Sequence, residues 1–138
     1  MIVVDTNVIA YLLLPGVHTE AARAAIATDA DWAAPLLWRS EFRNVLATYL
    51  RQRHLTLAQS LELQGAAEDL LEGREYSVES EAVLALTVSS GRSAYDCEFV
   101  ALARALGVPL VTSDRQILAS FPDTAIALKS FMGGQQDS

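Results

Sequence analysis

Four carboxylates in this sequence of 138 residues lie where a folded chain could gather them. Asp5 and Asp114 each follow an apolar run, Asp96 lies in the first turn of an apolar helical pattern, and Glu41 borders the apolar stripe of another. Carboxylate oxygens are the ligands that Mg²⁺ and Mn²⁺ prefer. The four acids are therefore candidate metal ligands and candidate catalytic residues.

Each of these acids also has an ordinary structural interpretation. Asp is among the best N-cap residues, so Asp5 and Asp114 could each cap a helix. Ser93 and Asp96 have the spacing of a capping box, although Glu or Gln is the usual partner. Glu41 could pack its stem while its carboxylate reaches solvent. The combination favours a metal site, because four clustered acids repel one another unless a hard cation lies among them.

Polar residues beside these acids could support such a site. The hydroxyl and amide side chains are Thr6, Asn7, Asn44, Thr112 and Ser113. They could orient a metal ligand or a water molecule, although caps and turns use the same residue types. Arg92 and Arg115 flank the acids in sequence and could hold a phosphate, but solvated surface charges are the more ordinary interpretation.

The elements that must position these residues alternate between strands and helices. Strands are predicted at 1–5, 31–35, 74–78, 108–113 and 124–128. Helices are predicted at 6–13, 19–28, 36–53, 56–73, 79–90, 93–107 and 114–121. This alternation predicts a three-layer α/β/α sandwich with a mainly parallel central sheet. Sites in such sheets lie beyond the carboxyl ends of the strands, where Asp5 and Asp114 are expected.

The helix at 56–73 carries the most specific local pattern. Thr56 and Gln59 have the spacing of a capping box at its start. Its leucines predict the side of the helix that faces inward. They are Leu57, Leu61, Leu70 and Leu71.

Length and composition indicate one domain, over residues 1–130, followed by a disordered tail at 131–138. A single cysteine, Cys97, allows no internal disulfide. The apolar N-terminus lacks a basic segment, and no run of about 18 apolar residues could span a membrane. We therefore expect a soluble cytoplasmic protein without a signal peptide.

The charge balance and the missing motifs narrow the possible chemistry. The formal net charge of −7 disfavours non-specific nucleic-acid binding, which depends on phosphate contacts. Metal binding to the four acids would reduce that repulsion. The sequence contains no phosphate-binding GxxxxGK[ST] loop and no Cys/His spacing for zinc, and both histidines, His18 and His54, are expected at the surface.

Taken together, the segments "VVDTNVI", "WRSEFRNVL" and "SAYDCEFVALARALGVPLVTSD" resemble the PIN-domain family and, within it, the VapC-type toxins. They span residues 3–114. The resemblance implies that the four acids bind one or two Mg²⁺ or Mn²⁺ ions. It assigns the supporting hydroxyl to Thr112 or Ser113, and the polar residue after the first acid to Thr6 or Asn7. Glu98, on the opposite side of its helix from Asp96, is left outside the site.

The same resemblance implies an activity and partners. A VapC-type protein is a metal-dependent endoribonuclease that hydrolyses RNA phosphodiester bonds with an activated water, and it is the toxin of a type II toxin–antitoxin pair. It is expected to form a homodimer. Its antitoxin is expected to lay an apolar segment into a groove between helices and to reach the acids with a basic residue.

Other functions remain open from the residues alone. A haloacid-dehalogenase-like phosphatase also begins with an Asp after its first strand, but it requires a second Asp two residues later, where this chain has Asn7. It also requires a lysine near the site, and the only lysine is Lys129. A receiver-like signalling module needs a lysine after a late strand as well. A metal-binding module without catalytic activity is the third alternative.

Overall fold

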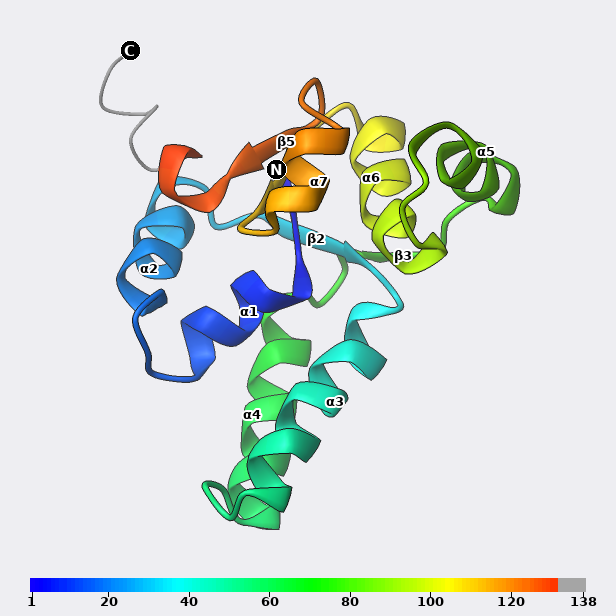
Figure 1. Ribbon diagram of the computed structural model, residues 1–138. Helices are drawn as coiled ribbons and strands as arrows, with labels where there is room; N and C mark the ends of the chain where they lie inside the picture. Colours follow the sequence, from blue (N-terminus) through cyan, green and yellow to red (C-terminus); the bar gives the residue numbers. More distant parts are fainter. Residues whose placement is uncertain (132–138) are drawn as a thin grey trace.

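A five-stranded parallel sheet forms the centre of the protein in a computed structural model that describes residues 1–131 (Figure 1). The strand order is β3-β2-β1-β4-β5, and every neighbouring pair is parallel. The strands are β1 (Ile2–Val4), β2 (Trp32–Pro35), β3 (Glu75–Tyr76), β4 (Leu110–Thr112) and β5 (Ala125–Ala127). The predicted parallel sheet is confirmed.

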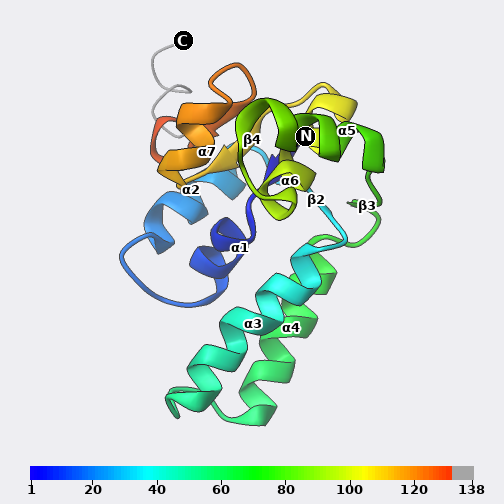
Figure 2. The same ribbon diagram turned by 45° about the vertical axis from the view of Figure 1, so that its right-hand side comes forward.

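Helices cover both faces of this sheet, as Figures 1 and 2 show from two directions. They are α1 (Thr6–Leu13), α2 (Thr19–Thr28), α3 (Trp38–Arg51), α4 (Leu57–Leu70), α5 (Ser80–Ser90), α6 (Ala94–Leu106) and α7 (Arg115–Ser120). α6 packs on β1, β2 and β4 and carries α5 on its outer side, whereas α1 and α2 lie together on the other face. The predicted three-layer α/β/α sandwich is confirmed.

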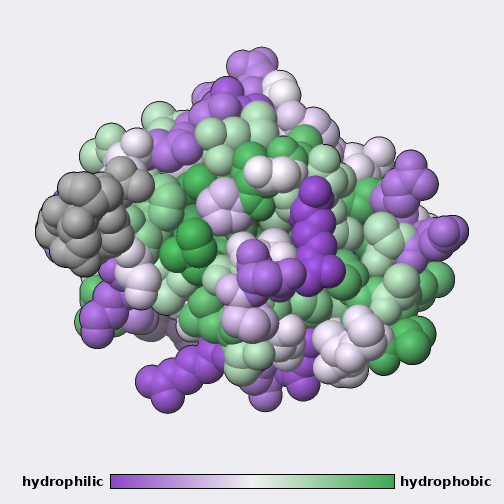
Figure 3. All heavy atoms as spheres, turned by 90° about the horizontal axis from the view of Figure 1, so that it is seen from above, coloured by the Kyte–Doolittle hydropathy of each residue, from purple (hydrophilic) through white to green (hydrophobic). Residues whose placement is uncertain are grey.

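The core surrounds the two central strands. Val3, Val4, Leu110 and Val111 are fully buried, because both faces of β1 and β4 are covered by helices. Hydrophobic residues also reach the surface between hydrophilic ones on the face seen from above in Figure 3. No helix within residues 1–131 is long and apolar enough to cross a membrane.

The topology brings the ends of β1 and β4 together. The connections from β1 and from β4 leave toward opposite edges of the sheet, and the two strands are neighbours with Val4 opposite Val111. Parallel register places the residues that follow the two strands side by side. This is the point at which ligands bind in open α/β sheets.

The helices α3 and α4 form an antiparallel pair that extends away from the sheet in both views (Figures 1 and 2). The capping box at the start of α4 is confirmed, because Thr56 Oγ1 accepts from the Gln59 amide at 3.1 Å and Gln59 Oε1 accepts from the Thr56 amide at 2.9 Å. This local contact needs no support from the rest of the fold.

The predicted inward face of α4 is partly wrong. Leu71, directly after the helix, is buried and Leu70 is partly buried, but Leu57 and Leu61 are 66% and 64% exposed. The buried side chains of α4 are the small Ser60 and Ala67. Since the helix pair extends beyond the sheet, α4 contacts only α3 and α1 closely among the described helices, and Leu57 and Leu61 face solvent.

Phe131, at the predicted boundary between the domain and its tail, is partly buried against the core. Residues 132–138, which make up the rest of the predicted tail, lie outside the described residues.

Candidate active site

All four predicted acids line one cavity of about 570 Å³ beside the carboxyl ends of β1 and β4. They come from four parts of the chain: the residue after β1, the first turns of α3 and α6, and the loop after β4. Three of the predicted supporting residues, Thr6, Asn7 and Asn44, line the same cavity. The fold thus brings together side chains that are up to 109 positions apart in sequence, Asp5 and Asp114.

Asp5 occupies the N-cap position of α1, but its side chain makes no cap hydrogen bond. Instead, Thr112 in β4 donates its hydroxyl to Asp5 Oδ2 at 2.7 Å. The same Thr112 hydroxyl accepts from the backbone amide of Asp114 at 3.0 Å. A single buried hydroxyl therefore links the first and last acids of the candidate site.

Asp114, in contrast, is a helix cap as well as a lining residue. Its Oδ1 accepts from the amides of Gln116 at 2.8 Å and Ile117 at 3.1 Å, at the start of α7. These two bonds use one carboxylate oxygen and fix the side chain. The cap does not use the other oxygen, Oδ2, so capping and ligation are compatible in this residue.

Glu41 lies in the first turn of α3 and is partly buried. Thr6, at the start of α1, donates its hydroxyl to Glu41 Oε1 at 2.7 Å. The contact connects two helices and holds the Glu41 carboxylate toward Asp5. Of the two predicted candidates after Asp5, Thr6 thus binds an acid directly, whereas Asn7 lines the cavity.

Asp96 lies in the first turn of α6, where Ser93 Oγ accepts from the Asp96 amide at 3.1 Å. The hydrogen bond from the backbone to the Ser93 side chain, one of the two bonds of a capping box, is therefore confirmed. Burial and the nearby Asp114 raise the pKa of Asp96, and Arg92 is the main cause acting in the opposite direction. Arg92 is partly buried and donates to Gln116 Oε1 at 2.6 Å, so it is a positioned charge and not the solvated one expected.

The Asp5 carboxyl has a pKa above its ordinary value. Burial is the largest cause, since it disfavours the charged form, and the charges of Asp114 and Asp96 raise the pKa further. The hydrogen bond from Thr112 and the nearby Asn7 amide act in the opposite direction. Burial and repulsion therefore outweigh local hydrogen bonding.

Glu41 has a raised pKa for the same reasons. Burial is again the largest cause, and the charges of Asp5, Asp96 and Glu98 add to it, while the hydrogen bond from Thr6 lowers the pKa. Carboxyl groups that are destabilised together in one cavity are typical of functional sites.

The donor set fits a hard divalent cation, although the side chains are not arranged as ligands. Within residues 1–131, no three acidic, histidine or cysteine side chains converge in a ready-made metal-binding group. Thr6 and Thr112 hold two of the carboxylates through short hydrogen bonds. Each of these hydrogen bonds uses one oxygen of its carboxylate, Oε1 of Glu41 and Oδ2 of Asp5, so support by threonine and metal ligation are compatible.

The structure also separates alternatives that the sequence left open. Thr112, not Ser113, contacts the acids, because Ser113 Oγ is paired with the Tyr11 hydroxyl at 3.0 Å. Glu98 lines a neighbouring cavity with Leu36 and does not line that of the acids. The charge of Glu98 nevertheless contributes to the raised pKa of Glu41.

Sequence reasoning missed several residues that line the cavity. They are Leu37, Ser40, Val45 and Tyr95. Leu37, the residue before α3, and Val45 on α3 lie four positions before and after Glu41, so helical periodicity could have identified them. Tyr95 directly precedes Asp96, and only its exposure in the fold distinguishes it.

The PIN domain family matches residues 2–124 of this chain, over the elements that carry the four acids. The chain belongs to the PIN-domain family. A relative, Ribonuclease VapC3 from Pyrobaculum aerophilum, is 30% identical over 127 residues, which are 88% of this chain and 95% of the relative. The resemblance predicted from the sequence is thereby confirmed.

Solved structures show the same PIN-domain fold. The crystal structure of PAE2754 from Pyrobaculum aerophilum has a TM-score of 0.77 at 20% identity, and the match covers 99% of this chain and 97% of that one. A chain of a toxin–antitoxin complex from Klebsiella pneumoniae has a TM-score of 0.68 at 17% identity, covering 93% and 98%. At these identities the likeness establishes the fold.

Proposed function

We propose that this PIN-domain protein is a metal-dependent endoribonuclease that hydrolyses RNA phosphodiester bonds and acts as the toxin of a type II toxin–antitoxin pair in the cytoplasm. The observation that carries the activity is the single cavity lined by four carboxylates, three of which have raised pKa values. The named ribonuclease relative supports RNA as the substrate.

Asp5, Glu41, Asp96 and Asp114 would hold one or two Mg²⁺ or Mn²⁺ ions, which when bound lower the pKa of a water and neutralise charge on a phosphate. The hydroxyl groups of two threonines hold three of these acids in position. Thr112 fixes Asp5 and the backbone of Asp114, and Thr6 fixes Glu41. Without histidine or cysteine in the cavity lining, the described residues supply no protein nucleophile of those types there.

The test is RNA cleavage by the purified protein with Mg²⁺ or Mn²⁺ and with EDTA. Cleavage should require the metal. Asp96→Asn should abolish it, whereas Glu98→Gln should not, because Glu98 lies on the same helix but lines another cavity. Equal cleavage in EDTA would refute metal dependence, and equal loss in both variants would refute the site.

The alternative functions lose support from the family match. A haloacid-dehalogenase-like phosphatase and a receiver-like module are different folds, and the PIN domain covers residues 2–124. A metal-binding protein without catalytic activity remains the competing hypothesis. It predicts metal binding to the four acids without any cleavage of RNA.

An antitoxin partner is supported by the toxin–antitoxin complex with a similar fold. A second cavity of about 290 Å³ lies beside α1 and α3 and is lined by Tyr11, Leu14 and Tyr49. It shares Asn7 and Val45 with the cavity of the acids. An apolar antitoxin segment in this second cavity could therefore extend a basic residue toward the carboxylates.

A homodimer is the proposed quaternary state. α5 exposes Leu84 by 58% and Val88 by 87%, and exposed apolar side chains on one helix favour a protein interface. One chain has a mass of 14.9 kDa, and light scattering at micromolar concentration should give twice that mass. A monomer at all accessible concentrations would contradict the proposal.

A further inference from the structure

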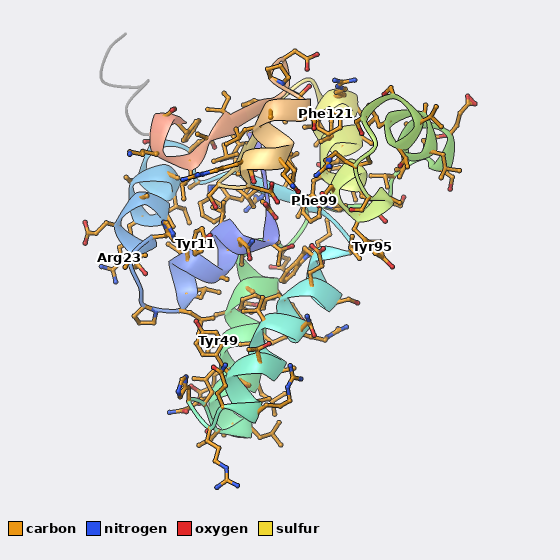
Figure 4. The ribbon with its side chains drawn as sticks, viewed as in Figure 1. Tyr11, Arg23, Tyr49, Tyr95, Phe99 and Phe121 are labelled. Carbon is orange, nitrogen blue, oxygen red and sulfur yellow. The ribbon has the colours of Figure 1, made fainter. Side chains whose placement is uncertain are left out.

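Tyr95 is a large aromatic side chain beside the acids that the proposed mechanism does not use. It is the second residue of α6 and is 63% exposed. Its side chain lines the same cavity as the four carboxylates. Figure 4 shows it at the start of α6, where that helix faces the N-terminal end of α3.

Packing does not account for the position of this ring. The neighbouring residues Cys97 and Phe99 on α6 are buried and connect the helix to the core, while Tyr95 lies on the solvent side. The residues described give its hydroxyl no hydrogen-bond partner in the interior. Replacing such an exposed side chain typically changes stability by less than about 0.5 kcal/mol. The ring is thus free to contact a ligand in the cavity.

The place of the ring relative to Asp96 sets what that ligand could be. Tyr95 and Asp96 line the same cavity, so a phosphate held at the carboxylates places its own nucleotide or the next within reach of the ring. Unpaired bases stack on exposed Tyr, Phe and Trp rings in proteins that bind single-stranded RNA. The cavity of about 570 Å³ is within the range of small-ligand sites, which extends from about 300 to 1,000 Å³.

We propose that Tyr95 stacks on an unpaired RNA base next to the phosphate that is cleaved. This inference rests on the proposed ribonuclease activity and specifies its substrate: a single-stranded segment, because a base held in a duplex is already stacked on its neighbours. Every base has an aromatic face, so Tyr95 favours unpaired RNA over paired RNA and discriminates weakly among the four bases.

The first experiment compares Tyr95→Ala, Tyr95→Phe and Tyr95→Trp on a single-stranded RNA oligonucleotide with Mn²⁺. Stacking is worth ~1–3 kcal/mol per base, so Tyr95→Ala should raise KM about 5- to 150-fold. Phe and Trp keep the ring and should stay within about twofold of the wild type. Leu57→Ala, at a residue of similar exposure on α4, is the matched control and should leave KM unchanged.

The second experiment removes the base instead of the ring. Oligonucleotides with an abasic ribose on either side of the cleaved bond are tested with the wild type and with Tyr95→Ala. At the stacking position, the abasic substrate should raise KM for the wild type but add little for Tyr95→Ala, because both changes remove the same contact. Thermal melts should show equal stability for all variants.

The outcomes distinguish the two proposals. If the wild type cleaves RNA but Tyr95→Ala has an unchanged KM, or if the two losses simply add, the stacking role is wrong and the ribonuclease proposal stands. If Tyr95→Ala weakens antitoxin binding and leaves RNA cleavage unchanged, Tyr95 is a protein contact and stacking is again refuted. If the wild type cleaves no RNA with either metal, both proposals fail.

Discussion

Two glutamates near the start of α3 have opposite environments. Glu75, in β3, accepts from Trp38 Nε1 at 2.7 Å and from Arg39 at 2.6 and 2.8 Å. The hydrogen bond from Arg39 is the main cause of its lowered pKa. Glu41 lies in the first turn of α3 and accepts one hydrogen bond from Thr6. It faces other acids, and burial is the main cause of its raised pKa.

This difference separates a structural carboxylate from the candidate catalytic ones. The Glu75 contacts attach the first turn of α3 to the sheet and satisfy the buried indole of Trp38. The acids of the cavity repel one another and stabilise the fold less than neutral residues would. A cluster that reduces stability in this way is expected where function requires it.

The largest expected effect comes from Asp5→Asn. Asn caps a helix about as well as Asp, so a capping role would leave the protein nearly unchanged. As a ligand, Asp5 is required: cleavage of RNA should fall by at least about a hundredfold, because a weakened metal site stabilises less of the charge that develops in the transition state. Wild type should also gain ~2.7 kcal/mol of stability at a Mn²⁺ concentration a hundredfold above its Kd.

The measurement is a pair of thermal melts on each protein, with EDTA and with excess Mn²⁺, beside the cleavage assay. The mutant should gain much less stability from Mn²⁺ than the wild type. An equal gain in both proteins would mean that Asp5 is not a ligand, and the contrast with Glu75 would lose its basis.

Glu75→Ala should have the converse effect, on stability and not on chemistry. It leaves the buried Trp38 N–H without an acceptor, which costs about 1–3 kcal/mol. Glu75→Gln keeps an acceptor oxygen and should cost less. Urea unfolding gives the free energies, and cleavage below the melting temperature should persist in both variants. A complete loss of cleavage in a folded Glu75→Gln protein would place Glu75 in the functional site.

Thr112→Val should have a smaller effect that involves both stability and activity. The hydroxyl donates to Asp5 and accepts from the Asp114 amide, so its removal should cost about 1 kcal/mol. Metal affinity should fall because Asp5 loses its support. Thr112→Ser retains the hydroxyl and is the control. Calorimetric titration with Mn²⁺ measures the affinity, and an unchanged Kd in Thr112→Val would exclude a positioning role.

The pH dependence should be the smallest effect and should differ in sign between the two regions. The ordinary pKa is 3.8 for Asp5, and its folded value is higher, so the folded state binds more protons above pH 3.8 and loses stability as the pH rises through that interval. Glu75 has an ordinary pKa of 4.5 and a lower folded value, so its stabilisation is present above pH 4.5 and is lost as the pH falls through the folded value.

Melts in EDTA from well below pH 3.8 up to neutral pH test this difference. The stability of Asp5→Asn relative to the wild type should rise with pH, since the mutant lacks the charge that burial disfavours. The stability of Glu75→Gln relative to the wild type should instead be highest at the acidic end. Parallel curves for the two variants would remove the proposed distinction between the regions.

The sequence by itself determined the elements whose signals are local. The apolar runs predicted β1 and β4, the Thr56–Gln59 spacing predicted a capping box, and Asp114 was recognised as a possible cap. The two caps form within a few residues, so their energies hardly depend on the rest of the chain, and the buried strands are marked by their continuous apolar residues. The four acids were singled out by their positions beside apolar runs and helical patterns, the resemblance to a family assigned them as metal ligands, and the family match confirmed that the chain belongs to the family.

The tertiary structure decided which neighbours of these acids take part. Thr112 and Ser113 are adjacent in sequence, yet one contacts Asp5 and the other Tyr11, because successive side chains of an extended chain point to opposite sides. The exposure of Leu57 on α4 was likewise decided by which elements pack against its helix. A pattern in sequence marks which side chains share a side of a helix or strand, but only the packed neighbours determine what each side faces.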